Sequence, residues 1–368
     1  MAHELQERYS DLVLAKMRSE LVLTDGFVFN NDYEGDPKAG SVKIPKRDTE
    51  VAVSDYDKAN GVAASSGSTE YVTLNITKDK AVNEIIDNYD AEAVPDNLIA
   101  DRLDSAGYSL AAQVDTDGAT ALLSGGTPVN IASLTKSNIY EAIVDIRTAM
   151  SKAKVPNDGR RYLLVTPDAM SLILKSPEFI SASDLGDEVK QQGILGKIAG
   201  FLVKEWNDST ANLAMIAGHP RYATRVLEWG VPVHIEDLNG SGKYIGACAV
   251  QGRSVYDHKV LRPTAVRCIF SPGNLTASLA PATGEGASGK TVVTVTAGNT
   301  GTTYAYKLNP ASRATFDETA TAYGGTSLTS GTTAIAASAG DVIEVVNLSS
   351  SKVKAVAYLT VSAGDIAD

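Results

Sequence analysis

Two segments rich in glycine and ending in lysine are the first candidates for chemistry, because such segments can bind phosphate. They are Gly193-Ile-Leu-Gly-Lys197 and Gly240-Ser-Gly-Lys243. Neither has the GxxxxGK[ST] spacing of a phosphate-binding loop, and Ile198 and Tyr244 stand where that loop needs the hydroxyl group of Ser or Thr. The two segments do not predict a nucleotide site, and no cofactor is expected.

Metal-binding residues are also sparse. Asp115-Thr-Asp-Gly118 begins like a calcium-binding loop, but the later acidic ligands and the closing Glu do not follow. We interpret this segment as a break in a long helix. Cys248 and Cys268 form no CxxC pair and have no clustered histidines, so we expect two reduced, buried thiols and no metal site.

Three histidines, His219, His234 and His258, are the candidates for a general base. None lies beside a nucleophile motif such as GxSxG, and a lone histidine is more often a packed or surface residue. Trp206 and Trp229 fit packing in a core or between subunits better than a ligand platform. The sequence therefore predicts no catalytic residue and no enzyme.

Charge and hydropathy restrict the function further. The 368 residues include 44 acidic and 33 basic side chains, which give a formal net charge of -11. This charge disfavours a protein whose main task is to grip nucleic acid, but it is compatible with a container for DNA. The N-terminus carries charges where a secretory signal has its apolar stretch, and no run approaches the roughly 20 apolar residues of a membrane span. We expect a soluble protein made in a cytoplasm.

The first 270 residues predict a mixed α and β fold. Helical spacing of apolar residues predicts helices over 3–19, 96–123, 137–152, 167–175 and 220–229. Strands are expected over 161–166, 198–206, 213–217, 231–235, 245–255 and 265–270. Residues 26–75 differ, because two short β-prone pieces flank a polar middle there, which predicts a long hairpin with little apolar content. Such a hairpin cannot bury itself, so we expect it to lie on another surface.

The composition changes abruptly near Ser271. All histidines, tryptophans, cysteines and methionines lie before it, and Thr, Ser, Ala and Gly dominate after it. Ser271-Pro-Gly-Asn274 is interpreted as a turn and a linker. Alternating apolar residues, such as those of 353–361, predict short strands that form a β-sandwich. Ala339-Gly-Asp-Val-Ile-Glu-Val-Val346 resembles strands of bacterial and phage immunoglobulin-like domains.

Over residues 1–271 the order of elements resembles the Hong Kong 97-type fold of tailed-bacteriophage major capsid proteins. Four segments match the extended loop and its return strand: Val42–Pro45, Asp55–Asp57, Leu74–Lys80 and Ile85–Asn88. Asp96–Leu123 matches the spine helix, Val155–Arg160 followed by Tyr162–Pro167 matches the entry into the axial domain, and Gly193–Gly200 matches the glycine loop.

The resemblance implies an α+β capsid fold followed by an all-β immunoglobulin-like sandwich. The implied parts are an N-terminal arm (1–29), an extended loop (30–76), a peripheral domain (77–128 and 251–271), an axial domain (129–250) and the sandwich (272–368). In this family, subunits join into pentamers and hexamers of an icosahedral head that encloses double-stranded DNA. The loop of one subunit lies over the peripheral domain of a neighbour.

The same resemblance implies the partners and the location. We expect a structural protein of the virion, made in the host bacterial cytoplasm, with a surface-exposed C-terminal domain and no membrane partner. Its partners would be other copies of itself, scaffold and portal proteins, and packaged DNA through weak non-specific contact only. The C-terminal domain would either bind polysaccharide weakly or stabilise capsomers.

The charge pattern suggests where neighbouring subunits meet. Lys38, Lys43, Lys46 and Arg47 cluster in the loop, whereas residues 79–104 are strongly acidic and include Asp96, Asp101 and Asp104. We expect the basic loop of one subunit to pair with the acidic region of the next, which would set register more than affinity. The alternative is two independent solvated faces.

Two other classes of protein stay open. An encapsulin-like bacterial nanocompartment shares the fold, but the appended β-domain favours a phage. A cell-surface adhesin with a β-sandwich tail is disfavoured, because no secretory signal is expected.

Overall fold

The computed structural model describes residues 18, 21–23, 26–37, 39–46, 53–62, 70–93, 98–177, 196–208, 210–296 and 303–368. Its contacts divide the chain into two compact units. One unit is Met1–Gly126 with Gly218–Val266, and the other is Thr127–Ala217 with Arg267–Asp368. The domain boundaries expected from the sequence stay predictions.

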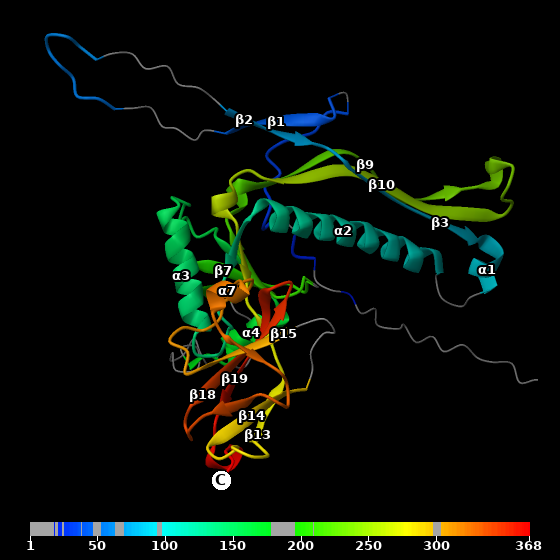
Figure 1. The fold of residues 1–368 in the computed structure, drawn as a ribbon. Helices are drawn as coiled ribbons and strands as arrows, with labels where there is room; N and C mark the ends of the chain where they lie inside the picture. Colours follow the sequence, from blue (N-terminus) through cyan, green and yellow to red (C-terminus); the bar gives the residue numbers. More distant parts are fainter. Residues whose placement is uncertain are drawn as a thin grey trace, which may run out of the picture. The chain divides into compact units, whose positions relative to one another are not determined.

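The first unit is built on an antiparallel sheet with one long helix along it (Figure 1). The strand order is β3 (Lys78–Asp87), β10 (Ala247–Val260), β9 (Ala223–Asp237). The helices α1 (Asn88–Ala93) and α2 (Leu98–Gly125) follow β3 in the chain. The predicted spine helix over 96–123 is thus confirmed.

Helix α2 covers one face of this sheet. Side chains alternate across a strand, so Ile86 of β3 and Cys248 and Val250 of β10 point towards the helix, where they pack with Ala106. The apolar spacing along α2 buries this stripe. In the part of the first unit that the structure describes, no helix covers the opposite face of the sheet.

The predicted long hairpin is also confirmed. β1 (Ser41–Lys46) pairs antiparallel with β2 (Glu70–Asn75). Ile44 and Leu74 at its base are buried against Val226 of β9. The base therefore packs on its own unit.

A short N-terminal stretch is anchored in the same unit. Leu23, Val28 and Phe29 are buried. The backbone amide of Asn30 donates to the Ala223 carbonyl group at 2.9 Å. The helix predicted over 3–19 lies outside the described residues, except for Arg18.

The second unit begins with a six-stranded sheet. Its order is β4 (Thr127–Asn130), β11 (Arg267–Phe270), β8 (Leu213–Gly218), β5 (Tyr162–Val165), β7 (Phe201–Glu205), β6 (Lys197–Ile198). β5 and β8 are buried along their whole length, as expected for central strands. The helices α3 (Ile139–Lys152) and α4 (Pro167–Leu174) accompany the sheet and confirm the helices predicted there.

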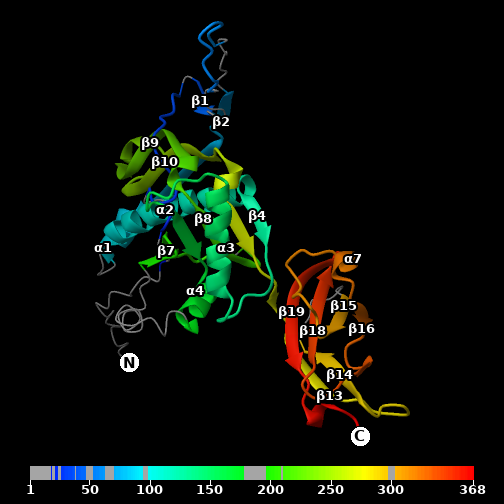
Figure 2. The same ribbon diagram turned by 90° about the vertical axis from the view of Figure 1, so that its left-hand side faces the viewer.

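A two-sheet β-sandwich completes this unit (Figure 2). One sheet has the order β12 (Gly273–Asn274), β19 (Lys352–Thr360), β18 (Val342–Ser349), β15 (Thr303–Leu308), β16 (Thr326–Leu328). The other has the order β13 (Ala277–Pro281), β14 (Lys290–Val295), β17 (Ala334–Ala336). The short helix α7 (Ala320–Tyr323) lies between β15 and β16 in the chain.

The helix predicted over 220–229 is wrong. Pro220–Tyr222 forms one 3₁₀ turn, and β9 begins at Ala223. Residues 223–227 pair with β10, and this long-range ladder overrides the local helical pattern.

The interpretation of Asp115–Gly118 as a helix break is also wrong, because α2 continues to Gly125. The side chains of Asp115 and Asp117 are both buried. Asp115 Oδ2 accepts a hydrogen bond from the backbone amide of Leu23 at 3.3 Å. Gly118 leaves room for Phe29, whose ring carbon lies 3.0 Å from the position that a Cβ atom would take.

Two further predictions need correction. The single strand predicted over 198–206 is a tight hairpin of β6 and β7, which turns at Ala199 and Gly200, both with positive φ. The linker predicted at Ser271–Asn274 is an ordered connection. Ser271 and Pro272 are buried, and Gly273–Asn274 pair with β19 as β12.

Candidate assembly surfaces

Large apolar side chains that stay exposed are concentrated on the first unit. They are Val53, Tyr56, Val62, Tyr71, Ile85, Tyr89, Leu227, Trp229, Ile235 and Ile245. In the part of the second unit that the structure describes, only Leu308 is comparable. Exposed apolar clusters mark interaction surfaces, so the first unit is the place to look for contacts with other molecules.

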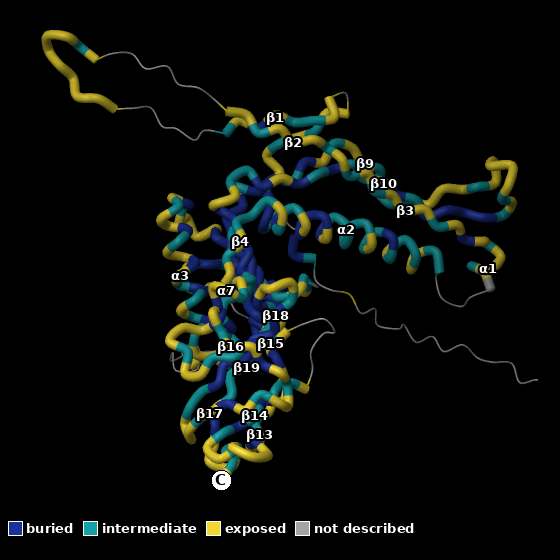
Figure 3. The backbone as a smooth tube through the Cα atoms, in the orientation of Figure 1, coloured by how far each residue is buried: buried dark blue, intermediate teal, exposed yellow. Residues whose placement is uncertain are grey.

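The hairpin tip, residues 53–62, is exposed along almost its whole length (Figure 3). The Asp57 carboxylate shapes its turn by accepting the Ala59 amide at 2.9 Å and Asn60 Nδ2 at 2.6 Å. These hydrogen bonds, above all the one from Ala59, hold the pKa of Asp57 below its usual value. The turn presents Tyr56, which is 75% exposed, and Val53, which is 98% exposed.

A second exposed surface is the sheet face that points away from α2, which we call the open face and define by Asp79, Ile85, Trp229 and Arg253. Arg253 donates to both carboxylate oxygens of Asp79, at 2.8 and 2.5 Å, and its guanidinium lies 5.4 Å from the centre of the Trp229 ring. This ion pair lowers the pKa of Asp79. The open face thus combines apolar side chains with a charge pair that is satisfied on its own chain.

Two of the basic residues predicted to contact neighbours, Lys43 and Lys46, lie on the hairpin. Lys43 is exposed on β1, and Lys46 Nζ lies 3.8 Å from Glu70 Oε2 across the hairpin. Lys38 and Arg47 lie outside the described residues.

Two of the acidic residues predicted to face them, Asp101 and Asp104, lie on α2. Asp101 is exposed, and Asp104 Oδ2 accepts from Arg18 at 2.7 Å. Asp96 lies outside the described residues. Glu84 of the same acidic stretch pairs with Arg102 at 2.7 Å. The sequence alone did not reveal these partners within the chain, which come from residues far apart in sequence.

A buried polar cluster in the first unit was also missed. Tyr256 Oη donates to Asp117 Oδ2 at 2.9 Å, and Lys78 Nζ lies 3.6 Å from the other oxygen. The His258 ring lies 4.8 Å from the Phe29 ring and 5.6 Å from the Tyr256 ring. Burial, helped by the charge of Arg225, lowers the pKa of His258 to about 4. The cluster fixes the N-terminal stretch to α2 and β10.

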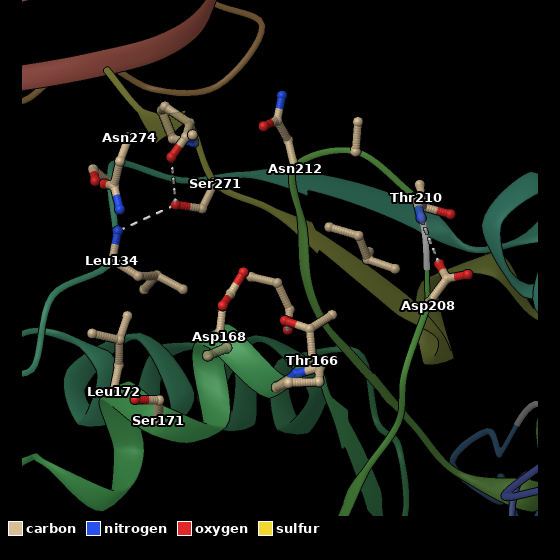
Figure 4. A pocket seen from close by; sticks show the side chains of 18 of the residues that line it. Leu134, Thr166, Asp168, Ser171, Leu172, Asp208, Thr210, Asn212, Ser271 and Asn274 are labelled. Carbon is tan, nitrogen blue, oxygen red and sulfur yellow. Dashed lines mark hydrogen bonds between the residues drawn. The ribbon is translucent and has the colours of Figure 1, made fainter. Parts of the chain in front are cut away.

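The second unit contains a cleft of about 750 Å³ beside the N-terminus of α4 (Figure 4). Its polar lining includes Asp168, Asp208, Asn212 and Ser271. No His, Lys or Arg is among the described residues that line it, so these residues offer no cation for an anionic ligand.

Two other kinds of site are absent from the described residues. No group of three or more His, Cys, Asp or Glu side chains there is arranged to hold a metal ion. No helix in that part of the chain has the length and apolarity that a membrane span requires.

Solved structures show where else this fold occurs. A chain from Mycobacterium phage Che8 is 24% identical, with a TM-score of 0.60 over 72% of this chain and 96% of that one. The capsid of cyanophage P-SCSP1u has a chain that is 14% identical, with a TM-score of 0.59 over 72% and 92%. The mature capsid of bacteriophage PhiM1 has one that is 13% identical, with a TM-score of 0.58 over 73% and 92%. The capsid fold expected from the resemblance is thereby confirmed.

A search of curated proteins finds no match. The model of the phage capsid protein family matches residues 73–269, which is more than half of the chain. This range includes β3, α2, the six-stranded sheet and β10. The chain therefore belongs to the phage capsid protein family, and its role is that of a structural protein of the virion.

Proposed function

We propose that the chain assembles into pentamers and hexamers that close an icosahedral head around double-stranded DNA. The observation that carries this proposal is the hairpin tip, whose apolar side chains are left in solvent by their own chain. Burying one such side chain stabilises a contact by roughly 1.5–3 kcal/mol. A tip repeated on every copy supplies that gain many times in a closed shell.

The partner surface that we propose for the tip is the open face of a neighbouring copy. Ile85 and Trp229 there are both 44% exposed, and these apolar side chains can be covered by the apolar side chains of the tip. The Asp79–Arg253 pair beside them is already satisfied, so covering it leaves no unpaired charge.

The test is assembly of the full chain with the double substitution Val53→Ser and Tyr56→Ser. Closed particles, counted by electron microscopy and analytical ultracentrifugation, should be lost, while the thermal unfolding midpoint of the unassembled chain should not change. Leu308→Ser, which removes a partly exposed apolar side chain of the second unit, is the matched control. Particles from the double variant at the wild-type yield would refute the proposal.

We also propose that charge sets the register between neighbouring copies at a second contact, which is separate from the open face because Asp101 and Asp104 lie on α2. Lys38, Lys43, Lys46 and Arg47 would face Asp96, Asp101 and Asp104 of a neighbour, as the clustering of opposite charges suggests. Changing Lys43, Lys46 and Arg47 to Glu should slow assembly most at low salt. Equal assembly rates for the variant and the parent chain across a salt series would remove this part of the proposal.

The net charge of -11 supports the enclosure of DNA, because an acidic wall holds its contents without binding them tightly. Scaffold and portal proteins would be the other assembly partners. We further propose that the sandwich faces outward and, in its many copies, binds polysaccharide weakly. Nuclease protection of packaged DNA tests whether the DNA is enclosed. Protease access to the sandwich on intact particles tests whether the sandwich faces outward. A glycan array probed with particles tests the ligand.

A further inference from the structure

Two separate stretches of the sandwich contact the six-stranded sheet of the same unit. The first is the connection from β11 to β12. The Ser271 amide donates to the Asn212 carbonyl group at 3.0 Å, and Ser271 Oγ accepts the Leu134 amide at 3.2 Å. Gly273 then joins β19, and a Cβ atom there would lie 3.1 Å from Asn212 Oδ1. This close approach leaves little room for a side chain.

The second stretch is residues 309–325, which we call the strap. Thr315 forms an antiparallel bridge with Ala132, and the Phe316 amide donates to the Ile131 carbonyl group at 3.1 Å. The Phe316 ring stacks on Phe270 of β11, with 5.7 Å between the ring centres. β4 is an edge strand, so the strap continues the pairing just past the end of that edge.

The sandwich in turn holds the strap. Asp317 pairs with Lys352 at 2.9 Å and with Lys354. The Ala314 amide donates to Glu344 Oε2 at 2.9 Å, and the Glu344 side chain is buried. Tyr323 is buried against the face of the five-stranded sheet that β13, β14 and β17 do not cover. The strap is thus fixed at both of its sides.

We propose that the sandwich is an intramolecular clamp on the six-stranded sheet, whatever ligand it binds. It holds the end of the β4 edge and the segment that follows it, residues 131–134. An unpaired strand edge is a template for pairing with other chains, and the strap occupies the position where pairing would continue beyond β4. The inference concerns the folded chain and does not depend on how copies assemble.

Amide hydrogen exchange of the full chain tests the clamp, read at Ile131 and Leu134. Phe316→Ala should accelerate exchange at both amides by about tenfold or more, because local opening then costs less. Asp317→Asn is the milder variant and should accelerate it in the same direction. Asp365→Asn is the matched control, since Asp365 caps a turn elsewhere in the sandwich through Ser362. It should leave both amides unchanged.

Wild-type exchange rates at Ile131 and Leu134 in both the Phe316→Ala and the Asp317→Asn variants would overturn the proposed clamp. Equal acceleration by Asp365→Asn would also overturn it, because the effect would then report general loosening of the sandwich. If Phe316→Ala does not fold, Asp317→Asn against Asp365→Asn decides the question alone.

Discussion

The five-stranded sheet of the sandwich is covered on both faces by its own chain, whereas the three-stranded sheet of the first unit is covered by α2 on one face. In the sandwich, Ile343 and Val345 pack against the smaller sheet, and Val346 packs against Tyr323 of the strap. In the first unit, α2 covers one face, and the open face keeps Ile85 and Trp229 in solvent. A sheet covered on both faces within its own chain is complete as a folded module. A sheet covered on one face leaves its other face available for contact with another molecule, as a shell-building subunit requires.

The largest effect should come from the covered sheet. Ile343→Ala removes a side chain with no exposed surface and should lower the free energy of unfolding of the sandwich by about 2–5 kcal/mol. Chemical denaturation of the full chain measures this change. Ile245→Ala is the matched control, because Ile245 is 91% exposed, and it should change the free energy of unfolding by less than about 0.5 kcal/mol. Similar values for the two variants would break the comparison.

Acid should destabilise the first unit before the sandwich. The pKa of His258 is lowered to about 4 by burial first and by the charge of Arg225 second, against the opposing charges of Asp257 and Asp117. The folded chain binds this proton more weakly than the unfolded chain does. The free energy of unfolding is therefore highest above about pH 6.5 and falls by roughly 3 kcal/mol as the pH drops towards 4.

Unfolding curves between pH 7.5 and pH 4.5 measure this loss. All four histidines precede Ser271, so the sandwich has none and its transition should stay nearly constant down to pH 5. His258→Phe should flatten the pH dependence of the first unit. An unaltered slope in that variant would assign the acid sensitivity to other groups.

A smaller effect is expected at the hydrogen bond between Tyr256 and Asp117. Tyr256→Phe removes the donor at 2.9 Å and leaves the buried Asp117 with Lys78. The free energy of unfolding of the first unit should fall by about 1–2 kcal/mol. Tyr71→Phe, on the exposed hairpin, removes a hydroxyl group without such a partner and serves as the control. No difference between these variants in urea denaturation would mean that the buried cluster does not hold the N-terminal stretch.

The smallest effect is expected for a surface ion pair of the first unit. Glu84 and Arg102 are both about two-fifths exposed, so solvent screens their attraction. Glu84→Gln should change the free energy of unfolding by less than about 1 kcal/mol, and less again in 1 M salt. A large, salt-independent loss would show that the pair anchors α2 to β3.

The spacing of apolar residues along the chain predicted the helices and strands whose formation depends mainly on that spacing. The apolar stripe of α2 and the alternating residues of β19 appear where they were expected. The strand predicted over 231–235 lies within β9, but the first part of β9 was mistaken for a helix, because its partner β10 lies further along the chain and no local residue reveals the ladder. Asp115 looked like a helix breaker, because the Leu23 amide that it binds is remote in sequence.

Of the two candidate surfaces, the sequence predicted the hairpin but not the open face. The hairpin was predicted from its lack of apolar residues, and its exposed tip lies within the range expected. The open face could not be predicted, because it exists only once β3, β10 and β9 are placed side by side. The charge pattern identified the acidic stretch but not Arg18, the partner of Asp104 within the chain.

The strand pairing also sets the order of events during synthesis on the ribosome. Asp87 of β3 pairs with Ala247, and Thr127 of β4 pairs with Arg267, so each sheet waits for a strand made much later. The apolar strands β5 and β8 emerge before either sheet can close. Folding of both units is therefore a late event in translation, and the strands β3 and β4 stay unpaired until β10 and β11 have left the exit tunnel.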